Sequence, residues 1–582
     1  MLKSNKLFAV LTALVVASLL LAACGAPTAA PAVAPATQAP AATLAPAAKA
    51  PAATSAPAAT PVPATAAPAA PTLAPTAMPD LKGGTVTIGI ANEPQTLDPG
   101  AAVMVQEQMI LLNLFDSLLA TAPDGTLHPG LALSWSANAA ATEFTFKLRP
   151  DVKFHDGTPF NGAAVKASFD HVLDPAIKDS GARSLLVDHK YKETVVTDDS
   201  DVTIKFDSAY PTFLHDAARQ WLSISSPTAL TKSGKDYGRN PVGTGPFRFV
   251  KWDAQSQIVV ERNPDYAWGP EYATHKGAAY LDQVVFRILP EAATRLTALQ
   301  TGELQIAADP TALDAIDLNK SGKAVLETFA QPGVPAMMML NTAKAPTDDV
   351  AVRKAMILSV NQDELAKTAF KDLGIPTYSV ISPTTWGFNK DAAATYKFNL
   401  DAAGKLLDDD GWKMGADGIR VKDGKKLTID YITSPTWEEA FNELLSGYLK
   451  KAGFDVNMRA MDDNAIGTEA AAGHYNMLYI YWTRADPSPL RNLFDSANIK
   501  DGSAYTRFVN ADLDKTLADA STATDDKVRL QDYMTAQKMI MDNALVLPLF
   551  TVNMLYLDLP SVKNFEFDLE GYPWFYDMTL AK

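Results

Sequence analysis

The residues best suited to ligand chemistry lie in residues 481–487 (YWTRADP), directly after an apolar run that is typical of a strand. Tyr481 and Trp482 offer flat rings that could stack on a ligand, although aromatic residues at a strand end often belong to the core. Arg484 could meet a carboxylate or pair with Asp486. Asp486 is followed by proline, a pair that also favours a helix start, with the aspartate as N-cap. Both a binding role and a capping role therefore stay open for Asp486.

Patterns typical of enzymes and metal sites are missing from the sequence. It contains no G-x-S-x-G, H-E-x-x-H or G-x-x-x-x-G-K-[ST] motif. The seven histidines are scattered, and we expect His155, in the turn sequence HDGTP, to order that turn. Adjacent acids at 438–439 and 462–463 are expected to be solvated, because neighbours in sequence rarely face one substrate. We therefore predict no catalytic residue, no metal site, no cofactor and no enzyme activity.

The composition excludes several other classes of protein. The chain has 582 residues and a formal net charge of −15. Nucleic-acid binding is disfavoured, because phosphate affinity depends on clustered basic residues, which this chain lacks. Cys24 is the only cysteine, so no intrachain disulfide can form. About 500 residues of ordinary globular composition remain after the N-terminal region, enough for two or three domains. We expect the protein to be a monomer.

The N-terminal region predicts export and anchoring. Lys3 and Lys6 precede an apolar stretch that ends at residues 21–24 (LAAC), the pattern of a secretory signal. The cysteine at the cleavage site resembles the bacterial lipobox, which implies a signal peptide over residues 1–23 and lipidation of Cys24. Residues 24–81, rich in Ala, Pro and Thr, predict an unfolded stalk that could extend about 150 Å. A secreted protein with an incidental cysteine is the alternative.

Two strand–helix–strand segments predict how the globular part is built. The first comprises a strand at 284–289, a helix at 291–300 and a strand at 303–307. The second comprises a strand at 427–432, a helix at 437–452 and a strand at 454–458. Gly302 and Gly453 stand where helix C-cap glycines belong. Such units favour parallel sheets, and their separation along the chain predicts two α/β lobes. The residues between the first strand, at 85–90, and Gly243 predict an additional, more antiparallel subdomain.

Several blocks resemble the extracellular solute-binding proteins of the dipeptide/oligopeptide/nickel class (family 5), the receptors of ABC importers. The resemblance spans about residues 82–575. The blocks, in chain order, are 96–99 (TLDP), 115–119 (FDSLL), 129–132 (PGLA), 148–160 (LRPDVKFHDGTPF), 240–247 (NPVGTGPF), 349–356 (DVAVRKAM) and 406–412 (LLDDDGW).

The resemblance implies an α/β, two-lobed, periplasmic-binding-protein type II-like fold with an extra subdomain in the first lobe. Lobe I would comprise residues 82–125, 240–338 and 552–582, with residues 126–239 as the inserted subdomain, and lobe II residues 339–551. Two extended crossings should form the hinge. The apolar runs at 335–342 (PAMMMLNT) and 545–552 (LVLPLFTV) are the candidates, and both are equally compatible with buried core strands.

The resemblance also implies binding roles for particular residues. Family members line the cleft with the segment that corresponds to residues 481–487, and in peptide receptors an aspartate there holds the α-amino group of the peptide. This implies that role for Asp486, although the spacing differs by the insertion of Arg484. Arg219 would contact ligand carboxylates, as in nickel-binding relatives, with Trp221 beside it. Apart from the resemblance, Trp386, in the loop PTTWG, could close over the cleft, and surface exposure or packing is an equal alternative.

These features predict a receptor that is anchored by lipid at the outer face of the cytoplasmic membrane. It would capture a small solute, most simply a peptide, by closure of two lobes and deliver it to an ABC permease with its ATPase. A receptor for nickel or another metal chelate is the first alternative, and a tethered hydrolase is the second.

Overall fold

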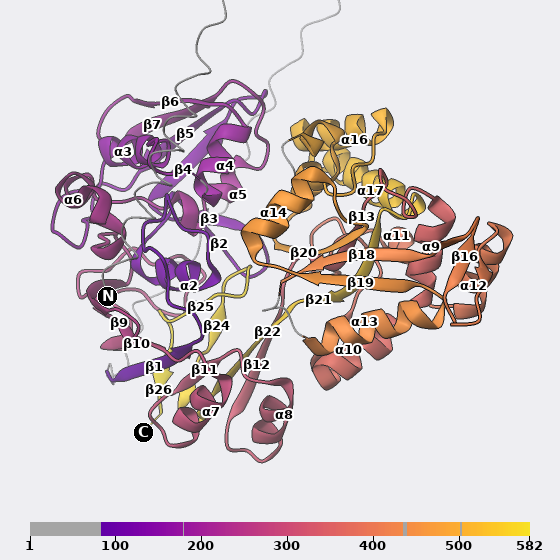
Figure 1. Ribbon diagram of the computed structural model, residues 1–582. Coiled ribbons are helices and arrows are strands. Elements are labelled where there is room, and N and C mark those ends of the chain that lie inside the picture. Colours follow the sequence, from indigo (N-terminus) through magenta and orange to yellow (C-terminus); the bar gives the residue numbers. More distant parts are fainter. Residues whose placement is uncertain (1–82, 179, 435–438, 501–502, 582) are drawn as a thin grey trace, which may run out of the picture. The chain divides into compact units, whose positions relative to one another are not determined.

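The computed structural model describes residues 83–178, 180–434, 439–500 and 503–581 (Figure 1). The predicted signal peptide, Cys24 and the whole predicted stalk lie outside these residues. The described residues belong to one compact unit. None of the helices in the described residues is long and apolar enough to cross a membrane.

The first lobe is built on a seven-stranded sheet with the order β12-β22-β11-β1-β10-β9-β8. Its strands are β1 (Thr85–Ile90), β8 (Phe247–Asp253), β9 (Gln257–Arg262), β10 (Gln283–Ile288), β11 (Ile306–Ala308), β12 (Val325–Ala330) and β22 (Asn553–Asp558). Strand β1 pairs in parallel with both β10 and β11. The predicted parallel unit around residues 284–307 is therefore confirmed, with β1 inserted between its two strands.

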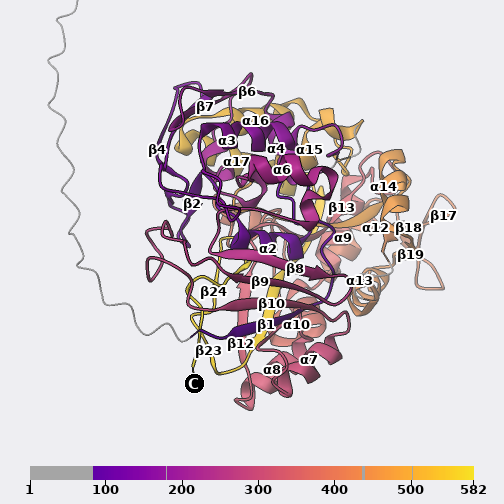
Figure 2. The same ribbon diagram turned by 90° about the vertical axis from the view of Figure 1, so that its left-hand side faces the viewer.

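Helices cover this sheet, and the end of the chain returns to it. They are α2 (Val105–Leu114), α7 (Ala292–Gln300) and α8 (Ala312–Lys320). Helix α7 contacts β11, and α8 contacts β12 and β22. Both helices lie near β12 in the two views (Figures 1 and 2). The C-terminal strands are β23 (Val562–Lys563), β24 (Glu566–Phe567), β25 (Pro573–Trp574) and β26 (Thr579–Leu580).

An antiparallel sheet forms within residues 126–239, the segment predicted to be the extra subdomain. Its strands are β4 (Ala132–Ala137), β5 (Glu143–Leu148), β6 (Tyr191–Val196) and β7 (Asp201–Phe206), in the order β4-β5-β7-β6. The helices α3 (Gly162–Val172), α4 (Gly181–Asp188), α5 (Phe213–Asp216) and α6 (Pro227–Ser233) accompany it. A two-stranded ribbon of β2 (Leu119–Thr121) and β3 (Leu127–Pro129) lies nearby in sequence. One continuous core joins this segment to the first sheet.

The second lobe has a six-stranded sheet with the order β14-β21-β13-β20-β18-β19. Its strands are β13 (Gly333–Leu340), β14 (Ile375–Pro376), β18 (Thr428–Thr433), β19 (Asp455–Ala460), β20 (Met477–Thr483) and β21 (Val546–Thr551). Strands β18 and β19 pair in parallel, which confirms the second predicted unit. Gly302 and Gly453 have φ of 80° and 97°, as expected of residues that follow helix ends.

Helices cover both faces of this second sheet. One face carries α9 (Val350–Ser359), α10 (Gln362–Phe370), α12 (Leu400–Asp409) and α13 (Glu439–Lys451), and the other α14 (Asp463–Ala472), α15 (Pro489–Phe494), α16 (Ala511–Thr522) and α17 (Asp526–Asp542). The short helix α11 (Lys390–Ala393) and a small sheet of β15 (Lys413–Met414), β16 (Arg420–Lys422) and β17 (Lys425–Lys426) complete the lobe. Because both faces are covered, β13 is a continuous apolar run and buries all eight residues.

The chain passes between the two sheets at two points. Strand β12 leads to β13 through residues 331–332, and β21 leads to β22 through Val552. At this point the Gln331 backbone N–H donates to the Val552 carbonyl oxygen at 2.9 Å. The predicted hinge runs, 335–342 and 545–552, are mainly the paired core strands β13 and β21. The change of sheet falls just before the first run and at the end of the second, and all of β13 belongs to the second sheet.

Candidate functional site

A cavity of about 470 Å³ lies where residues 484–486 of the second lobe meet the first lobe. This volume is within the range of small-ligand sites. Most of its wall belongs to the first lobe, including the segments 115–121, 215–220, 266–272 and 566–570. Its charged and aromatic lining residues are Phe115, Asp116, His215, Asp216, Arg219, Tyr266, Trp268, Tyr272, Phe329, Arg484, Asp486, Glu566, Phe567, Asp568, Glu570 and Trp574.

An ion pair joins the two lobes across this cavity. Arg484 follows β20, and its Nη2 donates to Oδ1 of Asp216, at the end of α5, at 2.7 Å. The two side chains are only 8% and 3% exposed. Asp216 also accepts hydrogen bonds from Tyr210 at 2.8 Å and from Thr212. Burial lowers the pKa of Arg484, but Asp216, Asp486, Tyr210 and Glu570 together outweigh this and raise it above its usual value, so the guanidinium stays charged.

Asp486 reaches the cavity from a turn that precedes helix α15. Its Oδ1 accepts the Ser488 backbone N–H at 2.8 Å. The helix begins at Pro489 with Ser488 at the N-cap, so the interpretation of Asp486 as N-cap is wrong by two residues. The apolar residues of α15, Leu490, Leu493 and Phe494, are buried. Burial raises the pKa of Asp486, but Arg484 and Ser488 outweigh this and hold it below its usual value, so Asp486 is ionised at neutral pH.

Arg219 is committed to a carboxylate of its own lobe. Its Nη1 and Nη2 contact the two carboxylate oxygens of Glu570 at 2.8 and 2.9 Å, and its guanidinium lies 4.3 Å from the ring centre of Trp221. Burial raises the pKa of Glu570 to about 7; Arg219 opposes the rise, and Asp568 adds to it. Asp568 itself accepts a hydrogen bond from Gln220 at 2.8 Å.

Asp116 anchors the block 240–247 to the cavity wall. Its carboxylate accepts hydrogen bonds from Thr244 at 2.8 Å, Trp268 at 2.8 Å and Tyr266 at 3.0 Å. Burial raises the pKa of Asp116 and these three donors oppose the rise. The glycines on either side of Thr244 pack on the end of α2, because a Cβ at Gly243 would lie 2.3 Å from the Leu114 carbonyl oxygen. The block therefore shapes the cavity without supplying ligand groups of its own.

The lining of the cavity is rich in carboxylates. Of the described residues that form it, six are acidic and two are arginines. Both arginines are already paired with acids of the lining. Two further arginines lie outside the lining. The charge of Arg149 lowers the pKa of Asp116, and the charge of Arg529 lowers that of Asp486. Even when these two are counted, negative charge exceeds positive charge, which favours a ligand that carries positive charge.

Four predicted site residues lie outside this cavity. Trp482 packs against the core of the second lobe, and Trp221 stacks on Arg219. Trp386 is 38% exposed and lies under the guanidinium of Arg529 at 4.7 Å. Tyr481 is 48% exposed and lines a second cavity of about 610 Å³, formed by residues 309–312 and 369–374 together with the strands at the crossing.

Sequence reasoning placed Arg219, Arg484 and Asp486 among the binding residues, and all three line the cavity. It missed five acidic residues that lie there with them: Asp116, Asp216, Glu566, Asp568 and Glu570. Asp116 stands within the recognised block 115–119, which was a usable signal. The other four lie in segments without a recognised block, and only the folded chain brings them to one cavity.

The histidines serve mainly structural roles. His155 donates its backbone N–H to the Gly243 carbonyl at 2.9 Å, and its Nε2 lies 3.0 Å from the Gly245 oxygen. Burial lowers the pKa of His155 to about 4, so its ring is neutral. Its turn is therefore tied to the block 240–247, in line with the predicted structural role. Among the described residues, no group of three or more His, Cys, Asp and Glu side chains could hold a metal ion.

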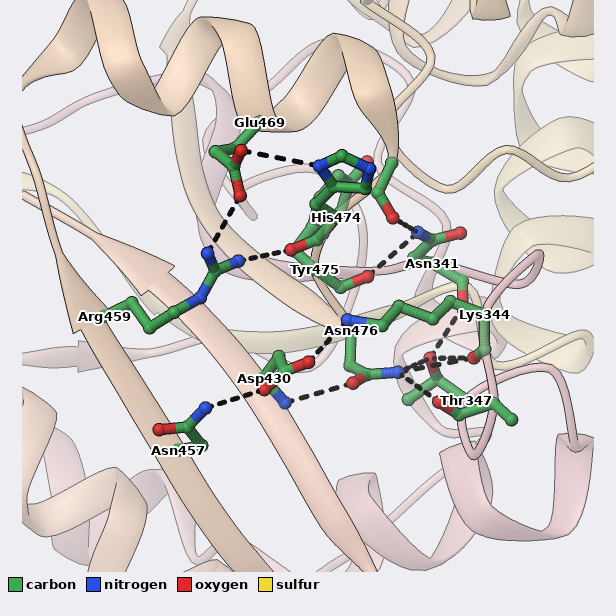
Figure 3. A network of polar contacts seen from close by, with 12 residues as sticks. Asn341, Lys344, Thr347, Asp430, Asn457, Arg459, Glu469, His474, Tyr475 and Asn476 are labelled. Atoms are coloured by element: carbon green, nitrogen blue, oxygen red, sulfur yellow. Dashed lines mark hydrogen bonds and ion pairs between the residues drawn. The ribbon is translucent and has the colours of Figure 1, made fainter.

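His474 belongs to a polar network in the second lobe (Figure 3), and none of the labelled residues of this network lines the cavity. It contacts Glu469 at 3.4 Å, and Glu469 pairs with Arg459 at 2.8 Å. In the same network Lys344 pairs with Asp430 at 2.5 Å. Its other labelled members are Asn341, Thr347, Asn457, Tyr475 and Asn476. These contacts tie the loop after β13 to β18 and to the start of β20.

The cavity also contains two serines and a histidine. Ser117 Oγ lies 2.9 Å from Ser223 Oγ and donates to the Arg219 carbonyl oxygen. Neither serine is hydrogen-bonded to His215 in the described part of the chain. The pairing that activates a serine nucleophile is therefore not formed there.

The cavity between two α/β lobes, joined by two extended crossings, is the arrangement of a type II periplasmic-binding protein. Residues 126–502 match the sequence profile of the bacterial extracellular solute-binding proteins, family 5 Middle. The chain belongs to this family and is therefore an extracellular solute-binding protein.

Individual relatives agree with this assignment. The probable di/tripeptide-binding protein 5 of Pseudomonas aeruginosa is 29% identical over 472 residues, which cover 76% of this chain and 85% of the relative. Among solved structures, NikA from Brucella suis in complex with Fe(III)-EDTA has a TM-score of 0.76 at 24% identity, over 85% of this chain and 99% of that one. DppA from Helicobacter pylori in complex with the peptide STSA has a TM-score of 0.70 at 25% identity, over 86% and 98%.

Proposed function

We propose that the protein is the peptide receptor of an ABC importer, anchored by lipid at Cys24 to the outer face of the cytoplasmic membrane. It captures a short peptide between its lobes as a monomer and delivers it to the permease and its ATPase. The binding step changes no covalent bond. A ligand that touches both lobes favours the closed arrangement, because it adds contacts that the open one lacks.

The observation that carries this proposal is the ionised carboxylate of Asp486 in the cavity. It comes from the second lobe, whereas most of the wall comes from the first, so a ligand bound to it contacts both lobes. The α-amino group of a peptide fits this carboxylate, since a charge-assisted hydrogen bond is strong in a part-buried site. The name of the Pseudomonas relative and the peptide bound to the Helicobacter protein support a peptide ligand.

A receptor for a metal chelate is the second candidate, because the Brucella protein of similar fold was solved with Fe(III)-EDTA. A chelate carries carboxylates, so its receptor needs cationic side chains that are not already paired with acidic residues. Here the two Nη atoms of Arg219 contact Glu570, and Arg484 is paired with Asp216. The excess of carboxylates in the lining opposes an anionic ligand further. The charges of the cavity therefore favour a peptide over a chelate.

Mass spectrometry of ligand carried by the natively purified protein tests the proposal. We expect a mixture of intact short peptides. A uniform metal chelate would overturn the peptide assignment, and cleavage of added peptides would favour the tethered hydrolase. Asp486→Asn should weaken binding of trialanine about 10-fold or more. Asp409→Asn serves as the control, because this acid is exposed and pairs with Lys405 on the surface of α12.

The anchor and the transport step need separate tests. Wild-type cells fed labelled palmitate should incorporate label into the protein, and Cys24→Ala should lose the label and be released into the medium. An unlabelled wild type would overturn the anchor without affecting the binding role. Deletion of the gene should reduce uptake of labelled trialanine, and normal uptake would overturn peptide delivery.

A further inference from the structure

Glu566 lines the cavity, but binding of a peptide amino terminus at Asp486 gives this residue no role. It lies in β24, directly opposite Trp574 in β25. Residues directly opposite in an antiparallel pair project to the same side of the ladder. Both residues line the cavity, so the carboxylate and the indole ring lie next to each other in its wall.

A second ring extends this surface. Tyr272 also lines the cavity, and its ring centre lies 5.8 Å from that of Trp574, with the two planes tilted by 51°. Tilted aromatic rings beside a carboxylate form a favourable environment for a cation, because the ring faces and the carboxylate both attract positive charge. A neutral apolar side chain would gain only from the rings.

No cation of the described residues neutralises Glu566. Its side chain makes no hydrogen bond or ion pair within the described part of the chain. Lys276, on the loop next to Tyr272, donates to the carbonyl oxygens of Gly269 and Pro270. Asp577 acts on Glu566 as a like charge, and its own partner is His275 at 2.6 Å. Burial raises the pKa of Glu566, and Asp577 raises it further.

We propose that Glu566, Trp574 and Tyr272 form a subsite for a positively charged side chain, so that the receptor prefers short peptides containing lysine or arginine. The inference rests on the proposed function, since it assigns a second group of the same ligand. Asp486 holds the amino terminus from the second lobe, and Glu566 holds the side chain from the first. Such a ligand carries two positive charges into a cavity whose lining has four more acids than arginines.

Isothermal titration calorimetry with matched tripeptides tests the preference. Trialanine is compared with peptides carrying lysine at the first, second or third position, and each of these with its norleucine counterpart. Norleucine keeps the alkyl chain of lysine and lacks the charge. We expect at least one lysine peptide to bind about 10-fold to 100-fold more tightly than its norleucine counterpart.

Three variants locate the preference within the cavity. Glu566→Gln should reduce the lysine-to-norleucine affinity ratio to near 1, and a circular dichroism spectrum like that of the wild type would show that the variant is folded. Trp574→Leu should lower the ratio about 2-fold to 10-fold. Glu271→Gln is the matched control, because it removes one negative charge beside Tyr272 from an exposed residue that does not line the cavity. It should keep the wild-type ratio.

The outcomes separate this inference from the proposed function. Equal affinity for every lysine and norleucine pair in the wild type overturns the subsite and leaves peptide binding intact. The same loss of preference in Glu271→Gln as in Glu566→Gln also overturns it, because a general field of the acidic lobe would then be responsible. Failure of all the peptides to bind overturns the proposed function and the subsite with it.

Discussion

Breaking the ion pair between Arg484 and Asp216 should expose how strongly the lobes are held together. Two unit charges about 4 Å apart interact by about 4 kcal/mol at an effective dielectric constant of about 20. Desolvation of two side chains that are 8% and 3% exposed offsets part of this. The hydrogen bond from Tyr210 to Asp216 reduces the desolvation loss. We expect a coupling of about 2 kcal/mol, within the range for close buried charge pairs.

The assay is a double-mutant cycle on the free energy of unfolding in urea, measured for Arg484→Met, Asp216→Asn and the double variant. Arg484→Met alone should cost about 3–5 kcal/mol, because it leaves a buried carboxylate without its cation. The same cycle on Arg287 and Glu303, an exposed pair at 3.0 Å, is the control and should give about 0–1 kcal/mol. Equal coupling energies in the two cycles would refute the reasoning, because burial would then add nothing.

Three further predictions concern other parts of the molecule. Burial raises the pKa of Glu570 to about 7, so the folded state binds a proton that the unfolded state has lost. The contribution of Glu570 to the free energy of unfolding should therefore fall by about 1–3 kcal/mol as pH rises from about 4.5 to 7. Glu570→Gln should abolish this pH dependence of the free energy of unfolding in urea. Gly243→Ala should cost about 1–3 kcal/mol, because its Cβ would lie 2.3 Å from the Leu114 carbonyl oxygen, whereas Gly447→Ala, with open space around its Cβ, should stabilise α13 by about 0.5–1 kcal/mol. Tyr481→Ala should change trialanine affinity less than 2-fold in calorimetry, since its ring lines the second cavity, and a loss of 10-fold would place that ring in the main site.

The sequence was informative where local pattern and packing agree. Strand β1 alternates and has the predicted bounds, and both strand–helix–strand units formed parallel pairs in the structure. The hinge was harder to predict, because residues 335–342 and 545–552 are apolar for a reason unrelated to bending. They are core strands, covered by helices on both faces of the sheet. The crossing residues, Gln331 and Val552, carry no local signal, since their role depends on which sheet each neighbouring strand joins.

The sequence predicted the second-lobe part of the site and Arg219 of the first lobe, but not the acidic residues of the first lobe. Arg484 and Asp486 stand close together in sequence, directly after an apolar strand, so the sequence alone indicates that they could bind a ligand. Asp216 lies more than 300 residues before Glu566 and Glu570 in the chain, and the three meet only when β24 and β25 return to the first lobe. The prediction that both Tyr481 and Trp482 bind ligand ignored the alternation of side chains along a strand. Neighbouring residues of β20 project to opposite faces, so only one of these two side chains could line a given cavity.

The proposed function and the proposed subsite assign closure and selectivity to different groups of this cavity, so the two can be separated by experiment. The pair of Arg484 and Asp216 contacts both lobes whichever ligand is bound, so its loss should weaken all peptides by one factor. Glu566 contributes only when the ligand has a charged side chain, so its loss should change the ratio between ligands. A variant of Arg484 that altered the lysine-to-norleucine ratio would show that the two groups act together, and the separation argued from their positions would then fail.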